Sequence, residues 1–260
     1  MQNPFLGFCS HDGPFDPRLV TVAAWDRLDA SREDIENYGL NWYESNVINP
    51  RQKAGERLIV TLEQARDRDD SDFNSWCASI VHRFLGRGIV WTYRNEPNLK
   101  TFCHWPNPST YVASAAEFWD RIPHTEVLLL GELSTFDQDY FEGMLAAGSE
   151  KVGTGYALHP YGNDPGGQVS HMLKYTTRPV FCTERAINGT SEEQLTDLLV
   201  STSAVKAAGA RCHIWYRWPC GAPSDPSFGN GVINPDGTPR ALLKALLSTS
   251  GTIGASTATS

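Results

Sequence analysis

The stretch GIVWTYRNEPN, residues 88–98, changes abruptly from a continuous apolar run to the polar pair Asn95-Glu96, which Pro97 follows. Continuous apolar runs rich in β-branched and aromatic residues are typical of strands buried on both faces, as in a parallel sheet. In a (β/α)8 barrel, active sites form where such strands end. The stretch therefore predicts a buried parallel strand with a functional carboxylate at its end.

Short apolar segments of this kind recur along the chain and give eight candidate strands in all. They are Leu6–Ser10, Leu19–Trp25, Leu58–Leu62, Ile89–Arg94, Val127–Leu130, Gly155–His159, Pro179–Thr183 and Cys212–Tyr216. Helical patterns lie between several of them, at Asp72–Leu85, Ser109–Trp119, Ser191–Ala208 and Pro239–Leu247.

Alternation of strands and helices over the whole chain predicts an α/β fold. Eight strands favour a single closed (β/α)8 TIM barrel over an open doubly wound sheet, which stays as the alternative. Neither GxGxxG after the first strand nor GxxxxGK[ST] is present, so the nucleotide-binding form of the open sheet is disfavoured.

Length and composition agree with one catalytic domain. The chain has 260 residues, close to the roughly 250 of a typical barrel. We expect this domain to span residues 1–247. Residues 248–260, STSGTIGASTATS, form a Ser/Thr/Gly-rich run with almost nothing to bury, and we expect a flexible tail there.

The charge and hydropathy of the chain exclude some partners. A net charge of −8 would repel a phosphate backbone, so we expect no nucleic acid partner. Since no apolar run approaches the roughly 20 residues of a spanning helix, we expect no membrane partner. The six cysteines show no CxxC or zinc-like spacing and are expected to be mostly reduced. We expect a monomer. MQNPFLGF at the N-terminus has no signal-peptide core, which fits a cytoplasmic protein or one begun after a cleaved signal.

Other predicted strands also end in polar or aromatic residues. GYALHPYG, residues 155–162, ends with His159-Pro160-Tyr161, and RPVFCTERAING, residues 178–189, delivers Glu184. Glu96 and Glu184 would then face one mouth of the barrel from opposite parts of the ring. Cleavage of a glycosidic bond needs two carboxyl groups that flank the bond. The sequence therefore predicts a glycosidase site, with carbohydrate as partner and no cofactor or metal.

The same motifs carry a resemblance. NEPN (95–98), VLLLGELS (127–134), ALHPYG (157–162), the TE pair (183–184) and GVINPDGTPRALLKAL (231–246) resemble, in this order, the large clan of retaining glycosidases on (β/α)8 barrels, in particular its xylosidase-like and cellulase-like members. The resemblance covers roughly Phe5 to Leu247.

The resemblance implies roles for individual residues. It makes Glu96 the general acid/base, Glu184 the nucleophile and Asn95 the group that holds the sugar 2-hydroxyl. His159 and Tyr161 correspond to residues that contact the nucleophile or the acid/base.

Aromatic and rim residues are expected to contact the sugar. Trp218 is expected to form the aromatic platform under the reacting sugar, with Trp215 as its rival. Trp25, closing the second predicted strand, and His11, after the first, are further expected sugar contacts.

The sequence also departs from the pattern of this clan. Arg185 stands where a glycine usually follows the nucleophile, and we expect it or nearby donors to keep Glu184 ionised. Gly131-Glu132 replaces a double glycine after the fifth strand. Glu63 and Glu132 also end predicted strands, so either could be an active-site carboxylate.

Other functions are weaker alternatives. A metal-dependent hydrolase is disfavoured because SHDG, residues 10–13, is not a paired His-x-His motif. A Ser-His-Asp hydrolase would need a GxSxG elbow, which is missing. A catalytically silent glycan-binding barrel stays open as the second function. The sugar and linkage are not specified, although short loops after the strands favour an open cleft and endo action.

Overall fold

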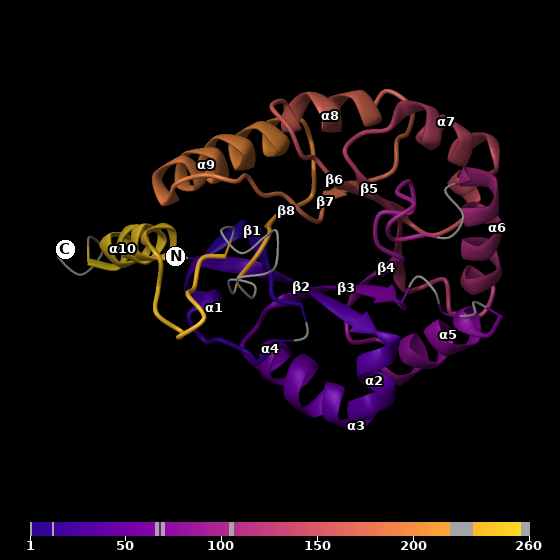
Figure 1. The fold of residues 1–260 in the computed structure, drawn as a ribbon, viewed down its shortest axis with the longest axis horizontal. Coiled ribbons are helices and arrows are strands. Elements are labelled where there is room, and N and C mark those ends of the chain that lie inside the picture. Colours follow the sequence, from indigo (N-terminus) through magenta and orange to yellow (C-terminus); the bar gives the residue numbers. More distant parts are fainter. Residues whose placement is uncertain are drawn as a thin grey trace.

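A computed structural model describes residues 2–11, 13–65, 68, 71–103, 107–218 and 231–255. Eight parallel strands close into one barrel in sequence order, and β8 returns to pair with β1 (Figure 1). The predicted single (β/α)8 barrel is confirmed. The strands are β1 Asn3–Cys9, β2 Ala23–Ser31, β3 Arg57–Glu63, β4 Val90–Tyr93, β5 Val127–Ser134, β6 Gly155–His159, β7 Val180–Cys182 and β8 His213–Trp215.

Helices form an outer ring around the strands (Figure 1). They are α1 Leu19–Val22, α2 Arg32–Tyr38, α3 Leu40–Tyr43, a π-helix at Glu44–Ile48, α4 Asn49–Lys53, α5 Phe73–Arg83, α6 Pro108–Trp119, α7 Gln138–Ala146, a 3₁₀ turn at Ser149–Lys151, α8 Pro165–Met172, α9 Ser191–Ala207 and α10 Ala241–Ala255. None of the described helices is both long enough and apolar enough to cross a lipid bilayer.

Local sequence explains where these helices begin. Thr190 caps α9 through a reciprocal capping box with Glu193, and Asn107 and Asp137 accept backbone N–H groups at the starts of α6 and α7. The helix ring packs on the outside of the barrel over a large apolar cluster that includes Leu28 of β2. Apolar residues of the strands fill the inside of the barrel.

The second strand lies further along the chain than its apolar run predicts. Leu19–Val22 is the short helix α1, and β2 runs from Ala23 to Ser31. The strand carries three charged residues, Asp26, Arg27 and Asp29. Because these residues interrupt any apolar run, the apolar pattern does not identify this part of the strand. They are tolerated because opposite charges accompany them; Arg51, for example, places its Nε 2.6 Å from Asp26 Oδ2.

The C-terminal part also differs from the expectation. The final helix, α10, continues to Ala255, past the expected domain boundary at Leu247. Residues 256–260 lie outside the described part of the chain. Among the described cysteines, all five are free and buried, and Cys220 lies outside the described residues.

Candidate active site

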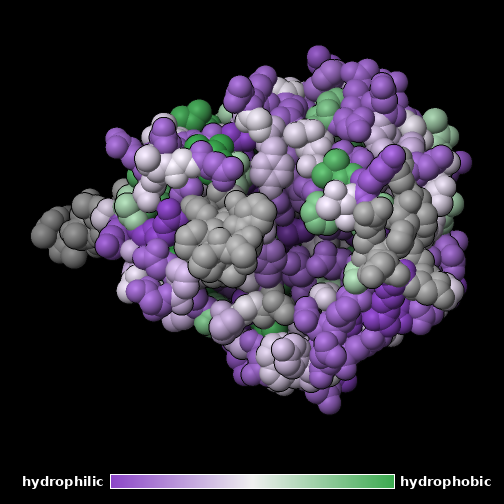
Figure 2. Space-filling model, viewed as in Figure 1, coloured by the Kyte–Doolittle hydropathy of each residue, from purple (hydrophilic) through white to green (hydrophobic). Residues whose placement is uncertain are grey.

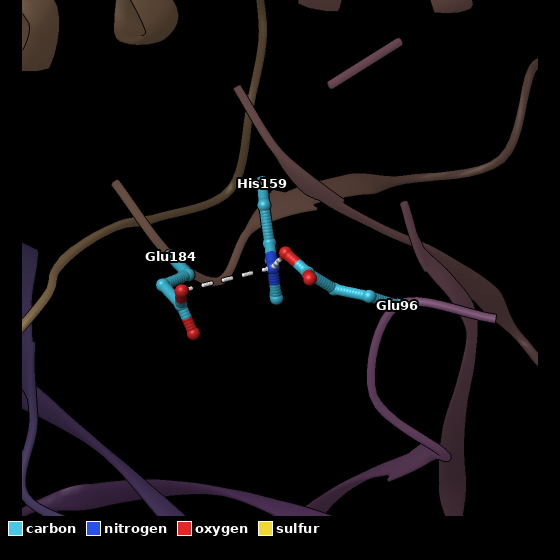
Figure 3. A group of neighbouring side chains, drawn as sticks. All are labelled: Glu96, His159 and Glu184. Atoms are coloured by element: carbon cyan, nitrogen blue, oxygen red, sulfur yellow. Dashed lines mark hydrogen bonds and ion pairs between the residues drawn. The ribbon is translucent and has the colours of Figure 1, made fainter. Parts of the chain in front are cut away.

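The barrel brings Glu96, His159 and Glu184 together at the carboxyl-terminal ends of β4, β6 and β7. One side-chain atom of each, a carboxylate oxygen or a ring nitrogen, lies within 4.8 Å of the other two. His159 Nδ1 is 2.9 Å from Glu96 Oε1 and 4.0 Å from Glu184 Oε1. Figure 3 shows the two glutamates reaching toward the imidazole ring from different strands. All three residues are buried.

Backbone strain collects at the same end of the barrel. In the described chain, the non-glycine residues with positive φ are His11, Arg94, Glu96, Glu132 and Thr135, with angles between 41° and 62°. Each lies at or near the carboxyl end of β1, β4 or β5. Left-handed backbone is unfavourable for such residues and concentrates at functional sites. The strain therefore marks this mouth, independently of the side-chain chemistry.

His159 carries a positive charge at neutral pH. Burial alone would lower its pKa, but the charge of Glu184 and the nearby carboxylates of Glu132 and Glu96 raise the pKa of His159 to about 10. Its Nε2 lies 3.7 Å from Glu132 Oε1. The protonated ring can therefore donate a hydrogen bond to Glu96. Its positive charge also lies within 4.0 Å of carboxylate oxygens of Glu132 and Glu184.

Two donors converge on Glu184. The Tyr161 hydroxyl donates a short hydrogen bond to Oε1, and Arg27 Nη1 lies 3.3 Å from Oε2. These two contacts hold both oxygens of the Glu184 carboxylate in place.

Arg27 of β2 is the functional residue that sequence reasoning missed. Its guanidinium is buried and contacts Glu132 Oε1 at 3.1 Å, Asn95 Oδ1 at 3.1 Å and Asp29 Oδ1 at 3.5 Å, besides Glu184. The signal that could have found it is WDRLD, residues 25–29, where a buried strand carries three charges.

A bulge in β5 turns Glu132 into the barrel. Gly131 pairs with Ala157 and Leu133 with the next residue of β6, so Glu132 is the extra residue, with φ of 44°. Bulges of this kind re-aim side chains beside active sites. Burial would raise the pKa of Glu132, but Arg27 and His159 lower it to about 2. Glu132 is thus an ionised carboxylate beside His159, and only 1% of it is exposed.

Arg185 or nearby donors were expected beside Glu184; nearby donors are found there, and Arg185 bonds elsewhere. Its guanidinium donates to the carbonyl oxygens of Pro160 and Gly162 and pairs with Asp197 of α9 at 2.6 Å. These bonds fix the loop that carries Tyr161. Arg185 therefore supports the site from outside, and the residues that face Glu184 are Arg27 and Tyr161.

Asn95 and His11 reach the same mouth. The Arg27 contact fixes the side-chain amide of Asn95, so its Nδ2 is oriented as a donor. His11 pairs closely with Asp29. Burial opposes its charged form, but Cys9 and Asp29 hold the pKa of His11 well above its usual range. Contact of either residue with a sugar stays a prediction.

The expected tryptophan contacts were wrong. Trp218 is 3% exposed and packs edge-on against Phe8 with ring centroids 5.0 Å apart, and Trp215 is buried in the same apolar cluster. Trp25 lies near the amino-terminal end of β2, where its Nε1 donates to the Pro4 carbonyl. Trp25 therefore lies at the end of the barrel opposite the site. The reason is that β2 begins at Ala23, later in the chain than the predicted strand Leu19–Trp25.

Tyr216, rather than Trp215 or Trp218, is the aromatic residue of its segment that lies beside the site. It directly follows β8, is only partly buried, and its ring lies edge-on to His11 with centroids 5.4 Å apart. RCHIWYRWP offered three aromatic residues within four positions, 215–218. Strand alternation separates them: Trp215 points outward into the helix layer, and Tyr216 contacts the apolar interior of the barrel.

The three central residues also satisfy the distance criterion for a metal site. In the arrangement that the structure shows, His159 directs Nδ1 toward Glu96 Oε1, at 2.9 Å.

Comparison with known proteins finds no matching family model and no matching curated sequence. Solved structures do match. A family 39 glycoside hydrolase from Bacteroides cellulosilyticus has a TM-score of 0.76 at 15% identity, over 96% of this chain and 64% of that one. A monomeric β-xylosidase from Caulobacter crescentus has a TM-score of 0.70 at 13% identity, over 95% and 67%.

An endo-β-1,4-glucanase from Xanthomonas axonopodis pv. citri matches over 96% of this chain and 99% of its own length, with a TM-score of 0.65 and 11% identity. The chain spans less than two thirds of the length of the Bacteroides protein. At these identities the likeness shows a shared fold.

Proposed function

We propose that the protein is a retaining glycoside hydrolase that cleaves β-glycosidic bonds, with Glu96 as general acid/base and Glu184 as nucleophile. The observation that carries the proposal is the approach of these two carboxylates, which have oxygens within 4.8 Å of each other. Retaining pairs are about 5–5.5 Å apart, whereas inverting pairs leave about 6.5–9.5 Å for a water molecule. The strand positions of the pair and the fold shared with glycoside hydrolases support the same proposal.

In the first step Glu184 attacks the anomeric carbon, and Glu96 protonates the departing glycosidic oxygen. Tyr161 and Arg27 hold one oxygen each of the Glu184 carboxylate, so the attacking oxygen is fixed in direction. The covalent glycosyl-enzyme forms as the carbon–oxygen bond to the leaving group breaks.

In the second step Glu96, now ionised, takes a proton from water, and that water displaces Glu184 from the anomeric carbon. The protonated His159 lies 2.9 Å from Glu96. This contact holds the Glu96 carboxyl in place between the two steps.

All of these groups come from one barrel, and we propose that one chain forms the complete site. Screening aryl β-glycosides of xylose, glucose, galactose and mannose tests the function. Turnover with first release of the β-anomer, followed by ¹H NMR, is expected. First release of the α-anomer would exclude a retaining mechanism. Binding of oligosaccharides without turnover of any substrate would favour a silent glycan-binding barrel.

A further inference from the structure

Glu63, the last residue of β3, lies between two cavities at the carboxyl-terminal side of the barrel. One cavity of about 390 Å³ is lined by Ser31, Glu33, Glu63, Gln64, Ala65, Arg94, Asn95, Thr101 and Phe102. The other, of about 420 Å³, is lined by Ser10, His11, Gly13, Asp29, Ser31, Asp34, Glu63 and Arg217. Glu63 and Ser31 line both cavities, so the two spaces adjoin at these side chains. Each volume lies within the range of small-molecule sites.

The two cavities lie beside Glu184 rather than apart from it. Asn95 lines the first cavity and Asp29 the second, and Arg27 contacts both of these residues as well as Glu184. Residues that line the cavities follow or end β1 to β4, or follow β8. The Glu96 carboxyl, in contrast, is held toward His159 of β6. If the leaving group departs between Glu96 and His159, the rest of the sugar chain extends over the ends of β1 to β4, where both cavities lie.

The linings suit a carbohydrate. Sugar hydroxyl groups both donate and accept hydrogen bonds, so a sugar subsite needs protein groups of both kinds. Asp29, Asp34 and Glu33 offer carboxylate acceptors, and Arg94 and Arg217 offer donors. Phe102 is 44% exposed and gives the first cavity an aromatic surface. Figure 2 shows that hydrophilic residues dominate this view of the molecule, including the hollow near its centre.

We propose that the two cavities are subsites for the two sugar residues that precede the reacting sugar on its non-reducing side, and that the Glu63 carboxyl hydrogen-bonds the sugars at their junction. This inference rests on the proposed function and deepens it. It makes the substrate an oligosaccharide or polysaccharide with at least three sugar units before the cleaved bond. Glu63 then determines preference for chain length and takes no part in bond cleavage.

The protonation state of Glu63 makes its proposed role dependent on pH, and this dependence can be measured. Burial and the negative charge of Asp29 raise the pKa of Glu63 to about 8, although Arg27 and His11 oppose the rise; Glu132 adds to it. Since the raised pKa belongs to an acid, the carboxyl is neutral below about pH 8 and ionised above it. A neutral carboxyl can donate to a sugar hydroxyl, and an ionised one only accepts.

The test compares kcat/KM for the 4-nitrophenyl β-glycoside of a monosaccharide with that for the matching β-1,4-linked trisaccharide, using a sugar that the wild type hydrolyses. In both substrates the aryl group occupies the leaving-group side, so only the proposed subsites distinguish them. We expect the wild type to prefer the trisaccharide at pH 6. Glu63→Ala should reduce the trisaccharide-to-monosaccharide ratio about five- to tenfold, the effect of one lost hydrogen bond.

Glu63→Gln keeps a neutral donor of the same size and should retain most of the preference. The wild-type ratio should also fall between pH 7 and pH 9, and the Glu63→Gln ratio should not. Glu142→Gln removes an exposed carboxyl on α7 and serves as the matched control for altered charge. Equal ratios in wild type and Glu63→Ala would overturn the subsites while leaving the glycosidase proposal intact.

Absence of turnover for every aryl glycoside would contradict the proposed function instead. Calorimetric binding of the free trisaccharide then still tests the subsites. Weaker binding to Glu63→Ala than to Glu142→Gln supports them, and equal binding overturns them.

Discussion

Arg27 Nη1 lies 3.3 Å from Glu184 Oε2, and this contact joins β2 to the end of β7 across the interior of the barrel. The same guanidinium pairs with Glu132 at 3.1 Å. Arg27 therefore links the buried Glu132 carboxylate to the proposed nucleophile. Both Arg27 and Glu132 are almost fully buried, so neither charge is tolerated without the other.

Removing Arg27 should damage both stability and catalysis. Arg27→Met removes the nearest cation from the buried Glu132 carboxylate, which keeps only His159 at 3.7 Å. Loss of one partner of a buried ion pair costs about 3–5 kcal/mol. We expect urea unfolding to show a decrease of this size in the free energy of unfolding. Arg121→Met, which breaks an exposed pair with Glu117 at the end of α6, should cost no more than about 1 kcal/mol.

The double variant Arg27→Met/Glu132→Gln separates the two roles. The second substitution removes the Glu132 carboxylate that Arg27→Met leaves without its nearest cation. Most of the stability that Arg27→Met loses should therefore return. Activity should stay low because Glu184 still lacks its cation. Full recovery of kcat together with stability would show that Arg27 acts only as a structural residue.

His159→Gln should change the pH dependence of catalysis. His159 has a pKa of about 10, raised against burial by Glu184, Glu132 and Glu96, so the substitution removes a positive charge between carboxylates at any pH below that value. Loss of a nearby cation makes carboxylates harder to ionise. The acidic limb of the kcat/KM profile should move to higher pH. An unchanged limb would mean that His159 is neutral in the working enzyme.

Removal of the Trp218 ring should mainly affect stability, and removal of the Tyr216 ring should mainly affect substrate binding. Trp218→Ala opens a cavity against Phe8 and should lower the free energy of unfolding by about 3–5 kcal/mol. Tyr216→Ala removes a partly exposed ring beside His11, and we expect a raised KM with a smaller loss of stability. Chemical denaturation and steady-state kinetics on both variants measure this. The reverse pattern would restore Trp218 as the sugar platform.

Alkaline pH should weaken the fold through Glu56. Both oxygens of its buried carboxyl lack hydrogen-bond partners, and burial together with Asp26 raises its pKa from 4.5 to about 9, against the effect of Arg51. Because the folded-state pKa is raised, this carboxyl favours folding fully below pH 4.5, and the contribution is lost as pH rises through 9.

The wild-type protein should therefore lose stability relative to Glu56→Gln between pH 5 and pH 9, by at most about 1.4 kcal/mol per pH unit. Unfolding in urea at pH 5, 7 and 9 measures the difference. Parallel stability curves for the two proteins would exclude Glu56 as a titrating group.

Apolar runs were enough to predict the closed barrel and the position of the two glutamates, because Glu96 and Glu184 directly follow buried strands. The charged interior could not be predicted in this way. Arg27 and Asp29 lie inside a strand that no apolar pattern identifies, and their burial depends on Glu132 and His11, which are remote in sequence. These residues come into contact only when the barrel closes, so the sequence pattern does not show that they pair.

The aromatic contacts failed for a related reason. A one-residue difference in register decides whether Trp215 or Tyr216 points to the interior. Trp25 was assigned to the wrong end of β2 because a short helix, Leu19–Val22, carries the apolar residues that mimic the start of a strand.

We propose Glu184 as the nucleophile and Glu96 as the acid/base, and chemical rescue by azide tests these two roles most directly. Glu96→Ala should lose about 10²–10⁴-fold on natural glycosides. It should still form the glycosyl-enzyme from a dinitrophenyl glycoside, whose leaving group needs no protonation, and then stall. Glu184→Ala should lose turnover of every substrate, since no glycosyl-enzyme can form.

Azide needs no deprotonation to attack. With Glu96→Ala it should restore turnover and give a β-glycosyl azide of retained configuration. With Glu184→Ala it should enter the vacated space directly and give the inverted α-azide. NMR of the two azide products is the decisive measurement. A β-azide from Glu96→Ala and an α-azide from Glu184→Ala are predicted, and the opposite assignment, or full activity of either variant without azide, would contradict the proposed roles.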